Sequence, residues 1–459
     1  MMINRTNVSP LHFLPSLVFM GGLISVLFSA SSVANVEFSS IWQTEMAVTK
    51  GSTVQKFESM WQPELNLSLN YTVDMTFIAR LRADTQHNLG YEGDRLDTSS
   101  AINGTLLEGN HADVEIREWY FDTEIAGAFW RLGKQQVVWG QADGLKILDV
   151  VNPQSYREFI LDNFEDSRIP LWMINGEIPI GDDDSLQLLW IVDQSYHRFA
   201  NNGSDYQITS PLLVPQPVAG IEVASFELHK PNNVLKDSDF GLRYMKFYQG
   251  WDLTFNYLYH YLDNPVFYQQ LSGNTVAIEA KYQRNNLFGL TASKAFDAWT
   301  IRSEVGYSTK SYHLLDPFSK ENTQAFIDYQ GVRESRDLSS VIGLDWQGLE
   351  NSMLSIQWFQ SSLLDYDDKI DSAMFRPKRN QIWSFLYQKS FVNDTWEVEA
   401  LVLYGVDQHD NSVQLELSHM LESNIKLWLS ADLFAGNQRS LFGQFNDVDR
   451  LVFGIEWGF

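Results

Sequence analysis

Eight charged residues of both signs crowd the middle of the first half of the chain, and their types are those of a pore constriction. They are Asp143, Asp149, Arg157, Glu158, Asp162, Glu165, Asp166 and Arg168. In channels, rings of charged side chains set selectivity, and arginine–carboxylate pairs can also fix a loop in place. We therefore take these eight residues as candidates for a constriction.

Catalytic groups are sparse by comparison. His260 lies on the polar side of a regularly alternating segment, as a general base would, but no serine or aspartate partner can be placed beside it. The sequence has no nucleophile-elbow, zinc-helix or phosphate-loop motif. The acidic run Asp365–Asp368 lacks the glycine and distal glutamate of a calcium loop. We expect no metal and no cofactor.

Short segments in which apolar and polar residues alternate flank this charged stretch on both sides. The longest spans residues 64–82, and period two over such a length predicts β-structure. We expect a first strand at 36–48, a tight turn near 70–72 and a bulge near Glu118. Many later segments begin or end on Trp or Tyr, among them 251–261, 276–282, 299–307, 396–404 and 425–433.

Alternation alone is also typical of a sandwich with a dry core, so the composition of the two faces decides. One face is aromatic and nearly free of charge, and aromatics make up 14% of the sequence. That face suits lipid, whereas the polar face suits a wet lumen. The sequence therefore predicts an all-β transmembrane antiparallel β-barrel. Closure and the even parity of bacterial barrels favour about 18 strands, with about 16 to 20 acceptable.

The N-terminal residues 1–34 have the features of a secretory signal peptide. Arg5 precedes an apolar run at 14–28, and Ser32-Val33-Ala34 follow as small residues. The alternative is a transmembrane anchor, for which the apolar run is short. We expect residues 35–459 to form the barrel. Cysteine is absent, so backbone pairing and packing must hold the fold.

The chain is strongly acidic, with a net charge of −25. Such a chain repels nucleic acid, so we expect no nucleic-acid partner. The acids gather at 182–184, 365–371, 407–410 and 447–449. Plain solvation of loop tips explains them, and divalent cation bridging to an anionic cell surface is the alternative. We expect outer-membrane lipid and lipopolysaccharide as partners of such a barrel.

The last nine residues alternate strictly and end on Trp457, Gly458 and Phe459. This resembles the terminal strand of bacterial outer-membrane barrels, which the barrel assembly machinery reads. Together with the signal peptide, the resemblance implies the outer membrane of a Gram-negative bacterium.

An insert at 141–168 interrupts the alternation. Leu145, Leu148 and Val151 are spaced by three, which predicts a short helical turn, and Asn152 and Pro153 favour the start of a second helix that presents an apolar face over 156–164. A long loop that is apolar on one side should not hang in solvent. We expect this insert to fold into the lumen as a plug or constriction. The alternative is a helical cap on the rim.

Aromatic residues in and beside the insert suggest a contact for an apolar ligand, although ordinary packing would use them too. They are Trp139, Phe159, Phe164 and Trp172.

A sequence motif runs through this region and carries a family resemblance. Its residues include Arg131, Gly133, Gln135, Trp139, Gly140, Asn152 and Pro153, followed by Arg157-Glu158 and 165–170. The chain resembles the proteobacterial family catalogued as domain of unknown function thirteen-hundred-and-two. The resemblance implies an outer-membrane barrel, often encoded beside a secreted companion and a resistance-nodulation-division permease. It implies no catalytic residues.

Three functions are compatible with these observations. The first is a channel or transport port for a small hydrophobic or amphipathic molecule, acting with an inner-membrane permease and a periplasmic carrier. The second is a structural or adhesive barrel whose loops bind a surface partner. The third is a barrel hydrolase, for which His260 is the histidine placed as a base would be. The sequence favours a channel that is not an enzyme.

Overall fold

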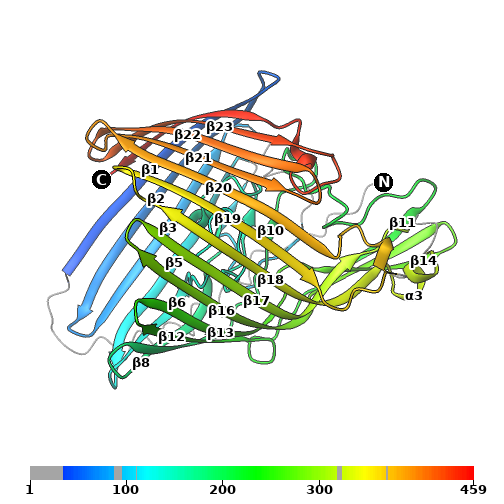
Figure 1. Ribbon diagram of the computed structural model, residues 1–459, viewed down its shortest axis with the longest axis horizontal. Coiled ribbons are helices and arrows are strands. Elements are labelled where there is room, and N and C mark those ends of the chain that lie inside the picture. Colours follow the sequence, from blue (N-terminus) through cyan, green and yellow to red (C-terminus); the bar gives the residue numbers. More distant parts are fainter. Residues whose placement is uncertain (1–34, 87–95, 110, 318–322, 369–370) are drawn as a thin grey trace.

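The chain forms a closed barrel of antiparallel strands (Figure 1). The computed structural model describes residues 35–86, 96–109, 111–317, 323–368 and 371–459, so the predicted signal peptide lies outside the described residues. Eighteen strands form the wall, and β1 pairs with both β2 and β24 to close it. The predicted all-β antiparallel barrel and its strand number are therefore confirmed.

The wall strands follow one another around the barrel in chain order. They are β1 (Asn35–Thr49), β2 (Val54–Asn70), β3 (Val73–Asp84), β5 (Ala112–Ile125), β6 (Ala128–Gln135), β8 (Leu171–Ile180), β9 (Asp184–Ile191), β12 (Asp239–Tyr248), β13 (Trp251–Tyr261), β16 (Arg284–Phe296), β17 (Trp299–Leu314), β18 (Val332–Trp346), β19 (Ser352–Leu363), β20 (Arg379–Phe391), β21 (Trp396–Gly405), β22 (Asp410–Glu422), β23 (Ile425–Ala435) and β24 (Arg450–Gly458). The two-residue strand β4 (Leu107–Glu108) pairs with β5.

Smaller elements occupy the connections. A second sheet extends beyond one end of the barrel beside helix α3 (Figure 1). Its strands are β11 (Glu222–His229), β14 (Val266–Ser272) and β15 (Thr275–Lys281); the remaining elements are β7 (Ser155–Tyr156), β10 (Arg198–Phe199), α2 (Phe164–Ser167), α3 (Thr323–Asp328), η1 (Asp371–Ala373) and η2 (Gly443–Phe445). The segment 276–282, which the alternation placed in the wall, belongs to this second sheet. Alternation identifies a strand but not the sheet it joins. Among the described residues, no helix is long and apolar enough to cross a membrane.

Inward and outward faces alternate along each wall strand. In β13, Thr254, Asn256 and His260 point into the barrel and are buried, whereas Phe255 and Tyr259 point outward, with Phe255 49% exposed. Because an antiparallel wall in lipid must present apolar side chains outward, this pattern is that of a membrane-spanning strand.

The two ends of the barrel differ in their connections. At one end the turns are short, and the predicted turn is confirmed as Tyr71 and Thr72 between β2 and β3. The C-terminus lies at this end, where the Ser40 amide donates to the Phe459 carbonyl at 2.7 Å. The insert, here residues 136–170, and the segment 192–238 both leave the wall at the opposite end.

The predicted bulge is also confirmed. The register between β3 and β5 shifts between Ile78 and Ala79, where Glu118 and Ile116 are the partners and Arg117 is the extra residue. Arg117 is 5% exposed and reaches the insert.

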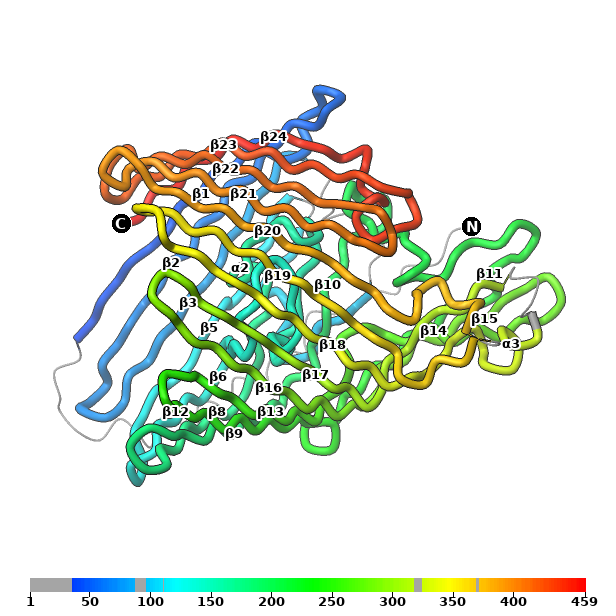
Figure 2. Tube along the Cα trace, viewed as in Figure 1, coloured from blue at the N-terminus to red at the C-terminus, as the bar shows by residue number. Residues whose placement is uncertain are grey.

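The interior of the barrel is filled rather than open. Figure 2 shows the teal segment of the chain, which contains the insert, inside the ring of strands. One apolar cluster packs insert residues against β8, β9, β13 and β16: Val137, Trp139, Leu148, Val151, Leu171, Met173, Leu189, Ile191, Leu258 and Leu287. A second packs Phe159 with Tyr206, Phe442 and Phe445 against β18 to β21 and β23. An 18-stranded wall would otherwise enclose water.

Candidate functional site

Asn152 holds the two ends of the insert together. Its Oδ1 accepts a hydrogen bond from the Val137 amide at 2.7 Å, and its Nδ2 donates to the carbonyls of Gln135 at 3.2 Å and Ile169 at 3.0 Å. The Ile169 amide donates in turn to the Pro153 carbonyl at 2.8 Å. Asn152 is 1% exposed, so these bonds are shielded from water.

The predicted helices at 145–151 and 156–164 are wrong. The only helix in the described insert is the four-residue α2, capped by Asn163, whose Oδ1 accepts from the Asp166 amide at 2.8 Å. Asn152 is used to join the insert ends instead of capping a helix. Phe159 has a positive φ of 56°, which no α-helix allows, and Ser155–Tyr156 pair with β10. Contacts with the wall override the local periodicity.

Asp143 fixes the first part of the insert to one side of the wall. Its carboxylate pairs with Arg302 of β17 and accepts from Gln357 Nε2 of β19 at 2.7 Å, and its amide donates to Gln357 Oε1 at 3.0 Å. Arg302 also pairs with Asp345 of β18 at 2.7 Å. Glu304 of β17 accepts from the amide of Leu148 at 3.3 Å.

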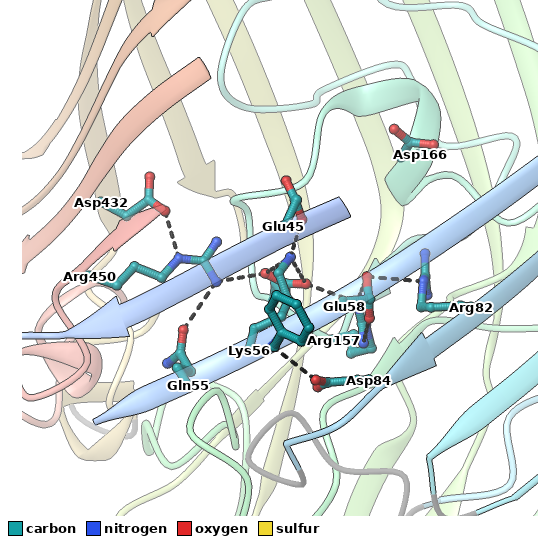
Figure 3. Close-up of polar contacts among 12 residues, drawn as sticks. Glu45, Gln55, Lys56, Glu58, Arg82, Asp84, Arg157, Asp166, Asp432 and Arg450 are labelled. Carbon is teal, nitrogen blue, oxygen red and sulfur yellow. Dashed lines mark hydrogen bonds and ion pairs between the residues drawn. The ribbon is translucent and has the colours of Figure 1, made fainter. Parts of the chain in front are cut away.

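Glu158 fixes the second part of the insert to other wall strands, and Figure 3 labels its partners Lys56, Arg157 and Arg450. Its carboxylate receives Lys56 Nζ of β2 at 2.8 Å, Arg450 Nη1 of β24 at 2.7 Å and Arg157 Nη2 at 2.9 Å. Arg157 Nη1 also lies 2.7 Å from Glu58 Oε2 of β2. We call Lys56, Glu58, Arg157, Glu158 and Arg450 the Glu158 cluster.

Charges in and around the Glu158 cluster balance. Glu45 lies 2.5 Å from Lys56, Asp432 lies 2.7 Å from Arg450, and Arg82 lies 3.4 Å from Glu58. Burial raises the pKa of Glu158, but Lys56, Arg450 and Arg157 outweigh it and hold the pKa well below its usual range. The Glu158 side chain is 1% exposed, so the carboxylate stays ionised only because these cations surround it.

The pKa of Asp162, four residues further on, is shifted in the opposite direction to that of Glu158. Burial, followed by the nearby Glu158 carboxylate, raises the pKa of Asp162 to about 6, although Arg157, Lys56 and Arg82 act against the increase. It is one of the eight predicted constriction residues.

The remaining predicted residues contact a third part of the wall or one another. Asp166 pairs with Arg80 of β3, and Arg117 of β5 donates to the Glu165 carbonyl at 2.6 Å. Arg168 Nη2 lies 2.7 Å from Asp149 Oδ2. The eight residues therefore form several separate contacts along the insert rather than one ring.

The motif residues that are not charged serve the geometry of the insert. Trp139 is fully buried, and its Nε1 donates to Gln187 Oε1 of β9 at 2.8 Å. Gly133 has a φ of +140°, and a Cβ there would meet the Trp119 carbonyl oxygen at 2.2 Å. A Cβ at Gly140 would meet Asp149 Cβ at 2.9 Å. Gln135 Nε2 donates to the Met173 carbonyl at 3.3 Å.

Arg131 pairs with a neighbouring wall strand. It lies on β6 and forms a two-point pair with Asp122 of β5, at 2.7 and 2.8 Å. This motif residue therefore strengthens the wall.

Of the four aromatic residues that suggested a single ligand contact, only Phe159 and Phe164 are brought together, at the cavity that both border. Trp139 and Phe159 belong to different apolar clusters, Trp172 packs edge-on against Trp119 with ring centroids 6.2 Å apart, and Phe164 borders a cavity. His260 Nε2 lies 3.4 Å from the Asn285 amide nitrogen, and neither a hydroxyl nor a carboxylate contacts its ring among the described residues.

Sequence reasoning missed the wall residues that receive the insert charges. Lys56, Arg80 and Arg450 lie far from the insert in sequence and look like ordinary polar-face residues of strands. The sequence did contain one signal for these residues, because a charged residue on the lumen face of a barrel strand needs a partner of opposite charge. The neighbouring sequence does not identify that partner.

Three cavities lie beside the insert, and we name them by position. The loop-side cavity (about 440 Å³) includes Ile147, His260 and Leu287; the middle cavity (about 280 Å³) includes Ile147, Phe159 and Asp162; the polar cavity (about 260 Å³) includes Glu158, Asp162 and Arg450.

The closed 18-stranded wall with long connections at one end and a segment folded inside defines a class, the porin-like barrels of bacterial outer membranes. Two solved structures share this fold. Pseudomonas aeruginosa OccK8 (OprE) has a TM-score of 0.52 and 10% identity, covering 93% of this chain and 98% of its own. Acinetobacter baumannii OccAB2 has a TM-score of 0.52 and 12% identity, with the same coverage. At such identities the likeness shows the fold alone.

The family described as "Protein of unknown function (DUF1302)" matches residues 43–459. The chain belongs to this family, as the motif residues indicated. No curated protein matches the sequence.

Proposed function

We propose that this protein is an outer-membrane channel for a small hydrophobic or amphipathic molecule, and that the insert controls passage. The observation that carries the proposal is the position of the insert, which is bonded to β17 and β19 through Asp143 and to β2 and β24 through Glu158. A segment tied to several parts of the wall obstructs free diffusion of water and ions through the lumen.

The nature of the remaining space favours an amphipathic solute. The loop-side and middle cavities have mainly apolar walls, whereas the polar cavity is lined by charged residues. Apolar constrictions hinder ions by dewetting, but they accept apolar groups. A solute that has an apolar part and a charged part can contact the apolar cavities and the polar cavity in turn.

Orientation and partners belong to the same proposal. Short turns of outer-membrane barrels face the periplasm, so the end that carries Phe459 would meet a periplasmic carrier and an inner-membrane permease. Cross-linking from the turn at Tyr71, which is fully exposed, should capture periplasmic partners if they dock there.

Single-channel conductance in planar bilayers tests the proposal. Intact protein is compared with a variant in which Ala142–Asp166 is replaced by a short Gly-Ser linker. We expect the intact protein to conduct weakly and the variant to form a stable open pore. A second variant, Asp143→Asn with Glu158→Gln, keeps the insert length and removes two wall contacts; it should show intermittent opening. An intact protein that is already open and unchanged by both variants would contradict control by the insert.

A second function has one observation in its favour. The sheet of β11, β14 and β15 extends beyond the barrel, and its edge strand β11 exposes Val223 and Phe226. An adhesive barrel would present such a surface. It would keep binding cells or polysaccharide after the insert is removed, whereas control of a channel would be lost.

A further inference from the structure

The three cavities are neighbours that share lining residues. Ile147 and Asn380 border both the loop-side and the middle cavity, and Asp162 borders both the middle and the polar cavity. Neighbouring compartments therefore meet at shared lining residues. Asp162 lies where the apolar part of the series changes to the polar part.

The middle cavity has the size and walls of a small-molecule site. Its volume of about 280 Å³ is close to the lower end of the range for ligand pockets. Its apolar side chains come from the insert on one side and from β19 and β20 on the other: Leu145, Phe159, Ile160, Phe164, Phe359 and Ile382. Such walls bind an apolar body and leave its polar end to be satisfied elsewhere.

Asp162 is the charged group available to that polar end. Lys146 also borders the middle cavity, but its Nζ donates to Gln154 Oε1 at 2.6 Å, lies 3.4 Å from Asp149 and sits over the Phe164 ring. The Asp162 carboxylate, by contrast, has no hydrogen bond or ion pair with any residue that the structure describes. The cations that act on its carboxylate, Arg157, Lys56 and Arg82, form ion pairs with Glu158 or Glu58.

The compartment beyond Asp162 has the same sign of charge. Among the residues that line the polar cavity, nine acidic side chains face five basic ones. Glu456 is one of the acids, and like Asp162 it has no ion pair among the described residues. A cation that passes Asp162 would therefore meet attraction rather than repulsion.

We propose that the middle cavity binds an amphipathic cation, with its apolar body between the insert and strands β19 and β20 and its ammonium group on the carboxylate of Asp162. The substrate class of the channel follows from this site, and this conclusion about the substrate rests on the proposed function. Binding of the cation in the middle cavity does not depend on the proposed function. A charge-assisted hydrogen bond from the ammonium group to the carboxylate supplies the specificity.

Binding can be measured on the full chain in nanodiscs by isothermal titration calorimetry near neutral pH. The probe is 2-phenylethylammonium, which has an aromatic body and one ammonium group; 3-phenylpropionate reverses the charge. We expect the ammonium probe to bind and the carboxylate probe not to. Asp162→Asn should weaken ammonium binding about tenfold or more, and Asp162→Glu should retain most of it. Glu456→Gln, which removes a lumen charge away from the middle cavity, should change affinity less than about twofold.

The outcomes separate the site from the function. Equal binding of the two probes, no loss in Asp162→Asn, or the same loss in Glu456→Gln would overturn the site. If binding behaves as expected while neither the intact protein nor the insert-replacement variant conducts, the site stands and the proposed channel fails. If the insert-replacement variant opens but Asp162→Asn leaves binding unchanged, the channel stands and this inference fails.

Discussion

At the scale of single residues, the contacts of Glu158 are unusual in that one carboxylate serves three cations. Lys56 and Arg450 come from wall strands and Arg157 from the insert itself, all within 2.9 Å. Because all of these groups are largely excluded from water, removing one charge leaves the others buried without compensation. The position of the insert therefore depends strongly on this side chain.

We predict that Glu158→Gln destabilises the insert by roughly 3–5 kcal/mol without unfolding the wall. Hydrogen–deuterium exchange should show faster exchange in residues 136–170 and unchanged exchange in the strands. The matched control is Glu416→Gln. Glu416 pairs with Lys426 at 3.0 Å in the same cavity, but both side chains are more than one-third exposed, so the loss should be below about 1 kcal/mol. Equal effects of the two variants would contradict the prediction.

A pH dependence follows from Asp162. Its raised pKa of about 6 means that the carboxylate is charged above that pH and neutral below it. Binding of 2-phenylethylammonium should be complete at neutral pH and be lost as the pH falls through about 6, because the ammonium group itself stays protonated throughout. Calorimetry at a series of pH values measures this. In Asp162→Asn the residual binding should not change over that interval.

At the scale of elements, the insert is shaped by its ends and by the wall rather than by helix propensity. Asn152 bonds to backbone groups at both ends, and Phe159 takes a left-handed conformation that places its ring against Phe445, with centroids 4.6 Å apart. Asn152 and Pro153, which look like a helix start in the sequence, therefore join the two ends of the insert instead.

We predict that Asn152→Ala loosens both ends of the insert, because the Val137 amide and the Ile169 carbonyl lose a buried partner. The expected cost is about 1–3 kcal/mol. Limited proteolysis should cleave within 136–170 faster than in the unaltered protein. Asn202→Ala, at an exposed position, should leave the cleavage rate unchanged.

The sequence was sufficient for the barrel but not for the arrangement inside it. Period-two alternation located most wall strands, and the phase slip near Glu118 located a bulge, because both are local consequences of backbone geometry. The acids and arginines of the insert were recognised as a group. Their partners were not, since Lys56, Arg302 and Arg450 meet them only after the wall has closed.

At the scale of the whole molecule, closure depends on the pairing of the first and last strands. β1 pairs with β24 from Ile41–Gly458 to Thr49–Arg450, and Phe459 adds reciprocal backbone bonds with Ser40 at 2.7 and 3.0 Å. The terminal residues that resemble an assembly signal are thus also part of the wall.

We predict that deleting Trp457–Phe459 reduces the amount of closed barrel in the membrane several-fold, because three residues of β1 lose their partners. The heat-modifiable mobility of the protein on gels measures the closed fraction. Phe459→Leu keeps the backbone bonds and an apolar terminus, and it should assemble much more fully than the truncated chain. Equal assembly of all three proteins would exclude a role for this end.

The Glu158 cluster has one more consequence, which concerns mechanical strength. Lys56 and Arg450 lie on β2 and β24, the strands on either side of β1, so Glu158 connects them across the line where the two ends of the chain meet. That line is the pairing of β1 with β24, which closes the barrel. We expect Glu158→Gln to lower the force at which β1 separates from β24. Force spectroscopy on the two proteins measures this force. Through Glu158, the insert would then stabilise the closing strand pair in addition to filling the lumen.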